Sequence, residues 1–254
     1  MKEKILITVK TYPTLSKKYA ELVCTAGVND TGQWRRIYPV PFRQLNSDQK
    51  YKKYQWIEVD LRKSTSDGRP ETYQIAGPLV IVNDPLPTTD YWRLRREAFI
   101  NKVKIHEDLN TLIKEAHDNK LSLAVFRPCK WIDFVAEPVE REWDAEKLAA
   151  LDAEKRQGRL FKDPETVIRE FEIVKKLPYK FSYRFEDVEG KKSKLMIEDW
   201  EIGALYWNCL RMNKNDEKQA MKKVRQRYWD GFVQNEKKDI LLVLGTTLEH
   251  GVVA

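Results

Sequence analysis

Segments in which apolar and polar residues alternate recur in the first part of the chain and again near residue 180. The residues Trp56–Lys63 alternate in this way, and Tyr179, Phe181, Tyr183 and Phe185 share one face of a second such segment. Apolar runs rich in β-branched residues add strands at 4–9, 22–28, 33–38, 79–82 and 239–244, and two further strand pieces within 121–134 are separated by Pro128. The pattern therefore predicts many short, mostly antiparallel strands.

Helical spacing predicts helices at 91–103, 108–117, 198–210 and 216–229, together with a charged surface helix within 137–162. We therefore expect an α+β fold with a mostly antiparallel, barrel-like sheet and flanking helices. We divide the chain into a strand-rich basic region (1–136), a charged helical connector (137–169) and a hairpin with helices (170–254). The first and last regions are expected to pack as one composite unit.

The stretch from Val9 to Arg43 contains a predicted hairpin whose return strand is basic and aromatic. Alternation places Trp34, Arg36 and Tyr38 on one face and Arg35 on the other. One interpretation is that the rings are ordinary core residues with an arginine between them. The other is that they form a surface on which bases stack and phosphates are neutralised.

The distribution of charge favours the second interpretation. The chain has 46 Lys and Arg against 39 Asp and Glu, a net +7, and residues 1–56 alone hold 11 against 4, again +7. A basic surface without a partner is the alternative, but the concentration of the excess indicates an anionic partner. The expected nucleic-acid contacts are Lys10, Tyr12, Lys17, Lys18, Trp34, Arg35, Arg36, Tyr38 and Arg43.

Three carboxylates are candidates for catalysis. Asp199 and Glu201 begin a predicted helix, where acids are also favoured simply by the helix dipole. Asp67 lies in the polar loop STSDGRPETY, and loops carry sites more often than strands do. A carboxylate facing the basic surface could activate water or stabilise a developing positive charge.

Other classes of chemistry have little support in the sequence. The three cysteines and three histidines are scattered, so we expect no metal centre, no disulfide framework and a cytoplasmic location. Phosphate-binding and dinucleotide-binding loops are absent, and no cofactor is expected. No segment approaches the roughly 18 consecutive apolar residues of a membrane span, so no membrane association is expected.

Four motifs resemble those of a little-characterised prokaryotic protein family often found near defence genes: KTYPTLSKKY, WRRIYPVPFR, LPYKFSYRFED and IEDWEIGALYWNC. More loosely, the chain is similar to defence DNA glycosylases that excise modified phage bases. That resemblance implies base flipping followed by cleavage of an N-glycosidic bond, and it assigns no catalytic residue to this chain.

The leading hypothesis is thus a DNA-directed hydrolase that flips out and excises a modified base in antiviral defence. Flipping costs a few kcal/mol, which stacking at about 1–3 kcal/mol per base could offset. The alternative is a non-catalytic reader of modified DNA or RNA, which needs the same surface without an acid. A third class, a protein-binding adaptor, would bury these aromatic residues instead.

Overall fold

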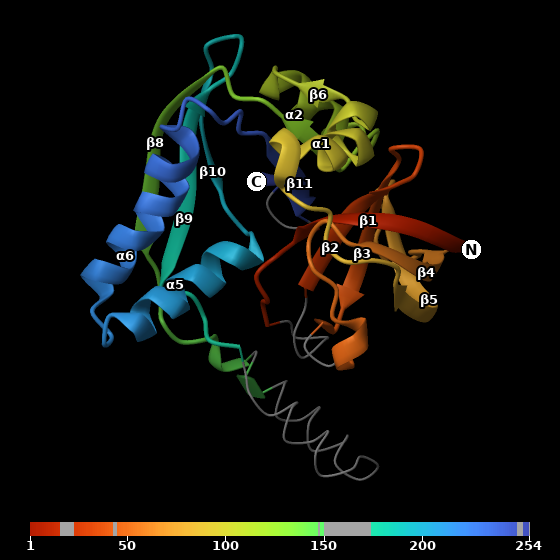
Figure 1. Ribbon diagram of the computed structural model, residues 1–254, viewed down its shortest axis with the longest axis horizontal. Helices are drawn as coiled ribbons and strands as arrows, with labels where there is room; N and C mark the ends of the chain where they lie inside the picture. Colours follow the sequence, from red (N-terminus) through yellow and green to blue (C-terminus); the bar gives the residue numbers. More distant parts are fainter. Residues whose placement is uncertain (16–22, 43–44, 147, 150–173, 248–250, 254) are drawn as a thin grey trace. The chain divides into compact units, whose positions relative to one another are not determined.

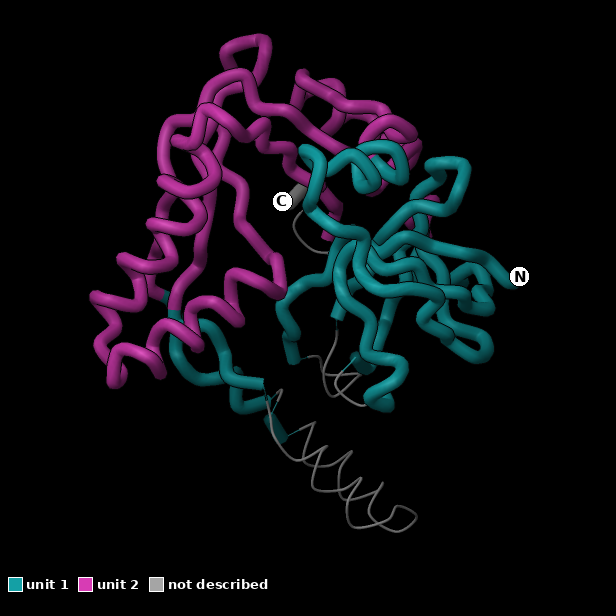
Figure 2. Tube along the Cα trace, viewed as in Figure 1, with its two compact units in different colours: residues 1–67, 72–99, 139–178 teal, residues 68–71, 100–138, 179–254 magenta. Residues whose placement is uncertain are grey.

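The computed structural model describes residues 1–15, 23–42, 45–146, 148–149, 174–247 and 251–253. The chain forms two compact units (Figure 2). Unit 1 comprises residues 1–67, 72–99 and 139–178, and unit 2 comprises residues 68–71, 100–138 and 179–254. The chain therefore passes from one unit to the other several times.

A closed five-stranded barrel forms the centre of unit 1 (Figure 1). Its strands are β1 (Lys2–Lys10), β2 (Val23–Asn29), β3 (Trp34–Val40), β4 (Trp56–Lys63) and β5 (Thr72–Ile81). The order around the barrel is β1-β2-β3-β5-β4, and β1 pairs with both β2 and β4. All pairs are antiparallel except β3 with β5. This is a five-stranded Greek-key barrel of the OB type.

The barrel closes around aliphatic side chains that alternate along the strands. Ile5, Ile7, Ile37, Ile57 and Val59 are all fully buried. Full burial of such a side chain stabilises the fold by about 1.5–3 kcal/mol. Strand β2 also passes very close to β1, because a Cβ on its glycine at position 27 would lie 2.0 Å from a backbone oxygen of β1. Only glycine fits there.

The rest of unit 1 consists of short elements outside the barrel. A 3-10 helix at Ser47–Gln49 lies in the connection from β3 to β4. Helix α1 (Thr89–Ala98) follows β5. Residues 139–146 and 174–178 contact each other, since the indole nitrogen of Trp143 donates to the carbonyl of Val174 at 2.8 Å.

Unit 2 contains a three-stranded antiparallel sheet in the order β10-β9-β8, with two helices beside it (Figure 1). The elements are β8 (Lys130–Pro138), β9 (Tyr179–Glu186), β10 (Lys192–Met196), α5 (Trp200–Met212) and α6 (Glu217–Arg225). Phe181 of β9 packs against Tyr206 of α5 at a centroid distance of 6.3 Å. Phe134 of β8 stacks on Tyr228, which follows α6, at 6.1 Å.

A second sheet of unit 2 has the order β12-β11-β7-β6. Its strands are β6 (Ile105–His106), β7 (Leu123–Phe126), β11 (Leu242–Thr247) and β12 (Gly251–Val253). Helix α2 (Leu109–His117) precedes β7 and is capped by Asp108, whose carboxylate accepts the backbone N–H of Asn110 at 2.8 Å.

The predicted α+β class with a mostly antiparallel, barrel-like sheet is confirmed. Three local predictions were wrong. Strand β5 begins at Thr72 rather than Leu79. The helix predicted at 91–103 is α1, which opens with left-handed residues and ends at Ala98. The helix predicted at 216–229 changes to a π-helix over Gln226–Val233. Most of the predicted charged connector helix lies outside the described residues.

Candidate nucleic-acid interface

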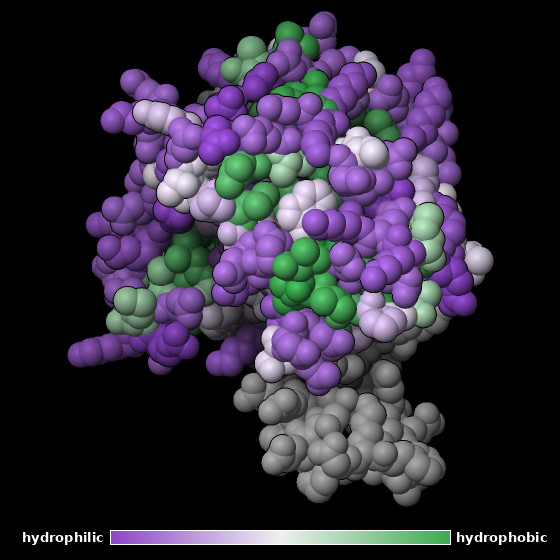
Figure 3. Space-filling view, turned by 45° about the vertical axis from the view of Figure 1, so that its right-hand side comes forward, coloured by the Kyte–Doolittle hydropathy of each residue, from purple (hydrophilic) through white to green (hydrophobic). Residues whose placement is uncertain are grey.

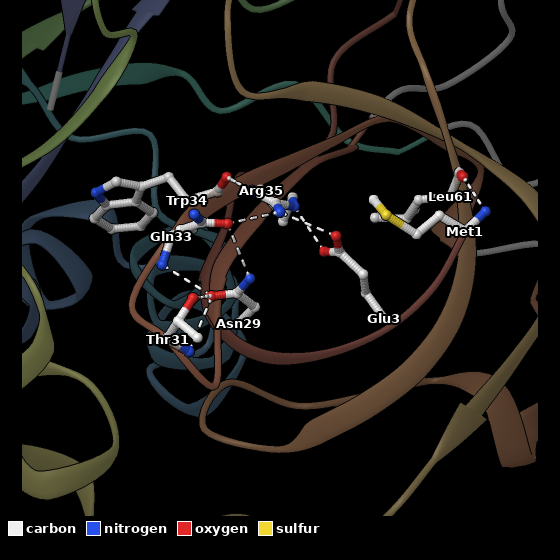
Figure 4. A network of polar contacts seen from close by, with 8 residues as sticks. All are labelled: Met1, Glu3, Asn29, Thr31, Gln33, Trp34, Arg35 and Leu61. Atoms are coloured by element: carbon white, nitrogen blue, oxygen red, sulfur yellow. Dashed lines mark hydrogen bonds and ion pairs between the residues drawn. The ribbon is translucent and has the colours of Figure 1, made fainter.

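The hairpin of β2 and β3 is held by a compact polar turn (Figure 4). The side-chain oxygen of Asn29 accepts the backbone N–H groups of Thr31 at 3.1 Å and Gln33 at 2.9 Å. Gly32 has φ 84°, a conformation that glycine adopts without strain. The turn fixes the register of β3, and so determines which of its side chains share a face.

Arg35 is directed at an acid of the barrel itself. Its Nε and Nη2 donate to the two carboxylate oxygens of Glu3 at 2.6 and 2.9 Å, and each side chain is only 12% exposed (Figure 4). Burial opposes the charge of the guanidinium, but the hydrogen bond and charge of Glu3 outweigh it and raise the pKa of Arg35. Arg35, which the sequence predicted to contact phosphate, therefore forms a bidentate ion pair that joins β1 to β3.

Trp34, Arg36 and Tyr38 lie on the other side of β3. Arg36 is opposite Ala26 in the register and is only 1% exposed. Trp34 is half-buried, with its ring edge-on to Phe99 at 5.5 Å, and Tyr38 is also half-buried. Both rings are thus partly accessible, but Arg36 between them is closed off from solvent.

Two further predicted contacts lie near the end of β1. The ammonium of Lys10 is 4.2 Å from the centre of the Phe42 ring. The hydroxyl of Tyr12 donates to the carbonyl of Lys175 at 2.8 Å, and this contact is exposed. Lys17, Lys18 and Arg43 lie outside the described residues.

Among the candidate acids, Asp67 belongs to unit 1, the unit that contains the barrel. It lies in the connection from β4 to β5, is 4% exposed, and its backbone N–H donates to the hydroxyl of Ser64 at 3.2 Å. The next four residues belong to unit 2, where the carboxylate of Glu71 accepts the N–H of Ser122 at 2.9 Å and its hydroxyl at 2.5 Å. The loop is thus anchored on both sides of Asp67.

Asp199 and Glu201 belong to unit 2, whereas the basic and aromatic stretch belongs to unit 1. Asp199 caps α5 by accepting the backbone N–H of Glu201 at 2.7 Å, and the Glu201 side chain is exposed. Burial, with a smaller contribution from the charge of Asp199, raises the pKa of the Tyr183 and Tyr228 hydroxyls. Asp199 therefore has an observed structural role.

The structure also reveals cations stacked on rings that the sequence analysis did not single out. Lys4 of β1 lies 5.4 Å from the ring centre of Trp56, and Arg95 of α1 lies 4.0 Å from Tyr54 and 4.8 Å from Trp92. All of these distances are within the range of cation–π attraction. The sequence signal was the basic and aromatic run YWRLRR, which was interpreted only as the start of a helix over 91–103.

The part of the chain that the structure describes contains no group of three His, Cys, Asp or Glu side chains able to hold a metal ion. The three cysteines, at positions 24, 129 and 209, are free thiols. None of the helices in the described ranges has the length and apolar character that crossing a membrane requires.

Two protein families match the chain, each described as a domain of unknown function. The family designated DUF8758 matches residues 1–101, and DUF8757 matches residues 103–252, which is more than half of the chain. Neither description assigns an activity. Comparison with curated proteins gives no match.

Proposed function

We propose that this chain, which belongs to the DUF8757 family, binds nucleic acid through the surface of its barrel unit. The observation that carries the proposal is the repeated stacking of cations on rings there, as in Lys4 on Trp56 and Arg95 on Tyr54 and Trp92. Cations neutralise phosphates, and rings held in place can receive bases.

The type of barrel supports the same proposal. OB-type barrels bind oligonucleotides or oligosaccharides with strands 2 and 3 and with the loops after strands 1 and 4. In this barrel Tyr12 lies in the first of these loops and Asp67 in the second. Because Arg36 on β3 is buried, the proposed contacts use the exposed Lys4 and its neighbouring rings rather than the centre of β3. DNA is favoured over RNA only by the sequence resemblance.

The salt dependence of binding tests this proposal. The affinity for a fluorescently labelled single-stranded DNA should fall linearly with salt on logarithmic axes, with a slope of about −0.7 per neutralised phosphate. Lys4→Gln should weaken binding and reduce the magnitude of that slope by about 0.7. Lys120→Gln, which removes an exposed lysine of unit 2 paired with Asp118, is the matched control. Failure of the unaltered protein to bind at low salt would refute the proposal.

A second candidate function is excision of a modified base in anti-phage defence, and the burial of Asp67 in the barrel unit favours it. Asp67 is the one candidate acid that shares a unit with the basic and aromatic residues. In this reaction it would orient water toward the sugar carbon as the N-glycosidic bond breaks. The three free thiols fit a cytoplasmic location.

Release of free base from DNA carrying modified bases separates excision from reading. On the excision hypothesis Asp67→Asn should abolish base release while binding persists, and Asp199→Asn should retain release. Binding by the unaltered protein without release, and without alkali-sensitive abasic sites, would leave the chain as a non-catalytic reader.

A further inference from the structure

Helix α1 begins with a left-handed turn made of three non-glycine residues. Asp90, Tyr91 and Trp92 have φ of 53°, 49° and 62° with ψ of 53°, 40° and 26°. Side chains at such residues crowd the backbone, so non-glycine residues normally enter this region singly. Strained backbone of this kind is concentrated where proteins bind or react. The turn therefore calls for a functional explanation.

The strained turn presents aromatic rings to solvent. Tyr91 is 90% exposed, the highest value among the large hydrophobic side chains of the described residues, and Trp92 is 46% exposed. On the face that Figure 3 shows, apolar side chains stand as separate patches among mainly hydrophilic residues. An exposed ring within a strained turn is more specific than such a patch, because the backbone conformation sets the direction in which the side chain leaves the chain.

The second ring of the turn is fixed by neighbours within unit 1. Trp92 lies edge-on to Tyr54 at 5.8 Å, and the Arg95 guanidinium lies over both rings. Arg95 is itself held, since its Nε donates to the carbonyl of Leu86 at 2.7 Å. Trp92 and Arg95 thus form a preorganised base for the turn, from which Tyr91 projects.

The charges on α1 suit an anionic ligand with flat groups. Arg93 is paired with Asp90 at 2.6 Å and with Glu97 at 3.5 Å. Arg96 is exposed and lies one helical turn beyond Trp92. A helix that carries both an exposed ring and an exposed cation matches a nucleobase and its phosphate better than an aliphatic protein surface.

We propose that the turn Asp90–Trp92 is a stacking site for an unpaired base of single-stranded nucleic acid, with Tyr91 as the ring that the base lies on. The inference rests on the proposed nucleic-acid binding and goes beyond it, because it names the strand state and the stacking residue. Arg96, an exposed cation on the same helix, is the residue proposed to contact a phosphate of the bound strand.

Two oligomers of equal length and charge test the stacking site with the full chain. One is labelled 20-nucleotide oligothymidylate, and the other is the same sugar-phosphate chain without bases. Tyr91→Ala should weaken binding of the oligothymidylate about 5- to 150-fold, the effect of one stacked base, and should leave the baseless oligomer unaffected. Tyr91→Phe should retain the affinity of the unaltered protein. Met212→Ala, at a residue of α5 that is 79% exposed, is the control.

The possible outcomes separate this inference from the proposed function. If the unaltered protein binds oligothymidylate and Tyr91→Ala binds it equally well, the stacking site is refuted while nucleic-acid binding stands. An equal loss on both oligomers would also refute stacking, because it would indicate lost phosphate contacts. If the unaltered protein binds neither oligomer at low salt, both proposals fail. Unchanged thermal unfolding of Tyr91→Ala shows that the variant is folded.

Discussion

Single residues of the predicted interface differ in what they contact. Arg35 and Arg36 are adjacent in sequence, yet one forms a bidentate pair with Glu3 and the other is only 1% exposed. Alternation in a strand separates two faces but does not tell which groups meet them. The partner of Arg35 lies 32 residues earlier in the chain, so only the closed barrel reveals the pair.

The Arg35–Glu3 pair should matter for stability rather than for binding. Glu3→Gln leaves a mostly buried guanidinium without its counter-charge, and we expect the free energy of unfolding to fall by about 1–3 kcal/mol. Denaturant unfolding measures this change. Lys2→Gln breaks only the exposed pair with Glu58 and should change stability by less than about 1 kcal/mol. Equal effects of the two substitutions would contradict the structural role of the buried pair.

The left-handed residues of α1 are a second feature that depends on single residues. Each costs about 1–2 kcal/mol relative to a right-handed helical residue, and no feature of the run YWRLRR signals it. The sequence run fits an ordinary helix, so only the backbone angles of Asp90–Trp92 distinguish a strained turn from a regular one.

At the scale of elements, the sequence predicted strands best where one face is buried. Strand β4 was predicted at its observed bounds, and β9 has Phe181, Tyr183 and Phe185 buried on one face. The first half of β5 was missed because the preceding polar loop contains Gly and Pro, which usually mark turns. That half is built by pairing with β4 and β3, and such pairing is a long-range property that local pattern does not contain.

The helix cap at Asp199 gives an element-scale prediction. Asp199→Ala removes the acceptor for the first turn of α5 and should destabilise the protein by about 1 kcal/mol. Asp199→Ser should recover most of the loss because serine is also a good cap. Unfolding midpoints of the three proteins measure the effect. A stable Asp199→Ala variant without base release would instead favour a catalytic role.

At the scale of the whole molecule, the division in sequence and the division in space are different. The two family matches meet between residues 101 and 103, whereas residues 68–71 belong to unit 2 and residues 139–178 to unit 1. Composition and charge are read along the sequence, so they can suggest only regions that are contiguous in it. Interleaved units arise from contacts between distant segments, such as Glu71 with Ser122.

Glu71 lies in the short segment 68–71, apart from the two long segments of unit 2. Its contact with Ser122 should nevertheless stabilise that unit. Ser122 is 2% exposed, and Glu71→Ala would leave its N–H and hydroxyl without the carboxylate. We expect a loss of about 1–3 kcal/mol, the cost of an unsatisfied buried group. Hydrogen exchange of the β7 amides would report it. Glu58→Ala, which removes only the solvent-accessible pair with Lys2, is the control, and similar exchange in both variants would contradict the prediction.

The interleaving of the units has a consequence for synthesis on the ribosome. All five barrel strands lie before residue 82, so the barrel can close while the sheets of unit 2 are still being made. Residues 68–71 must then wait for partners as late as Ser122 and Thr246. The order in which the chain emerges thus makes the barrel the first part able to fold, and a recombination event that exchanged either family segment alone would separate these residues from their partners.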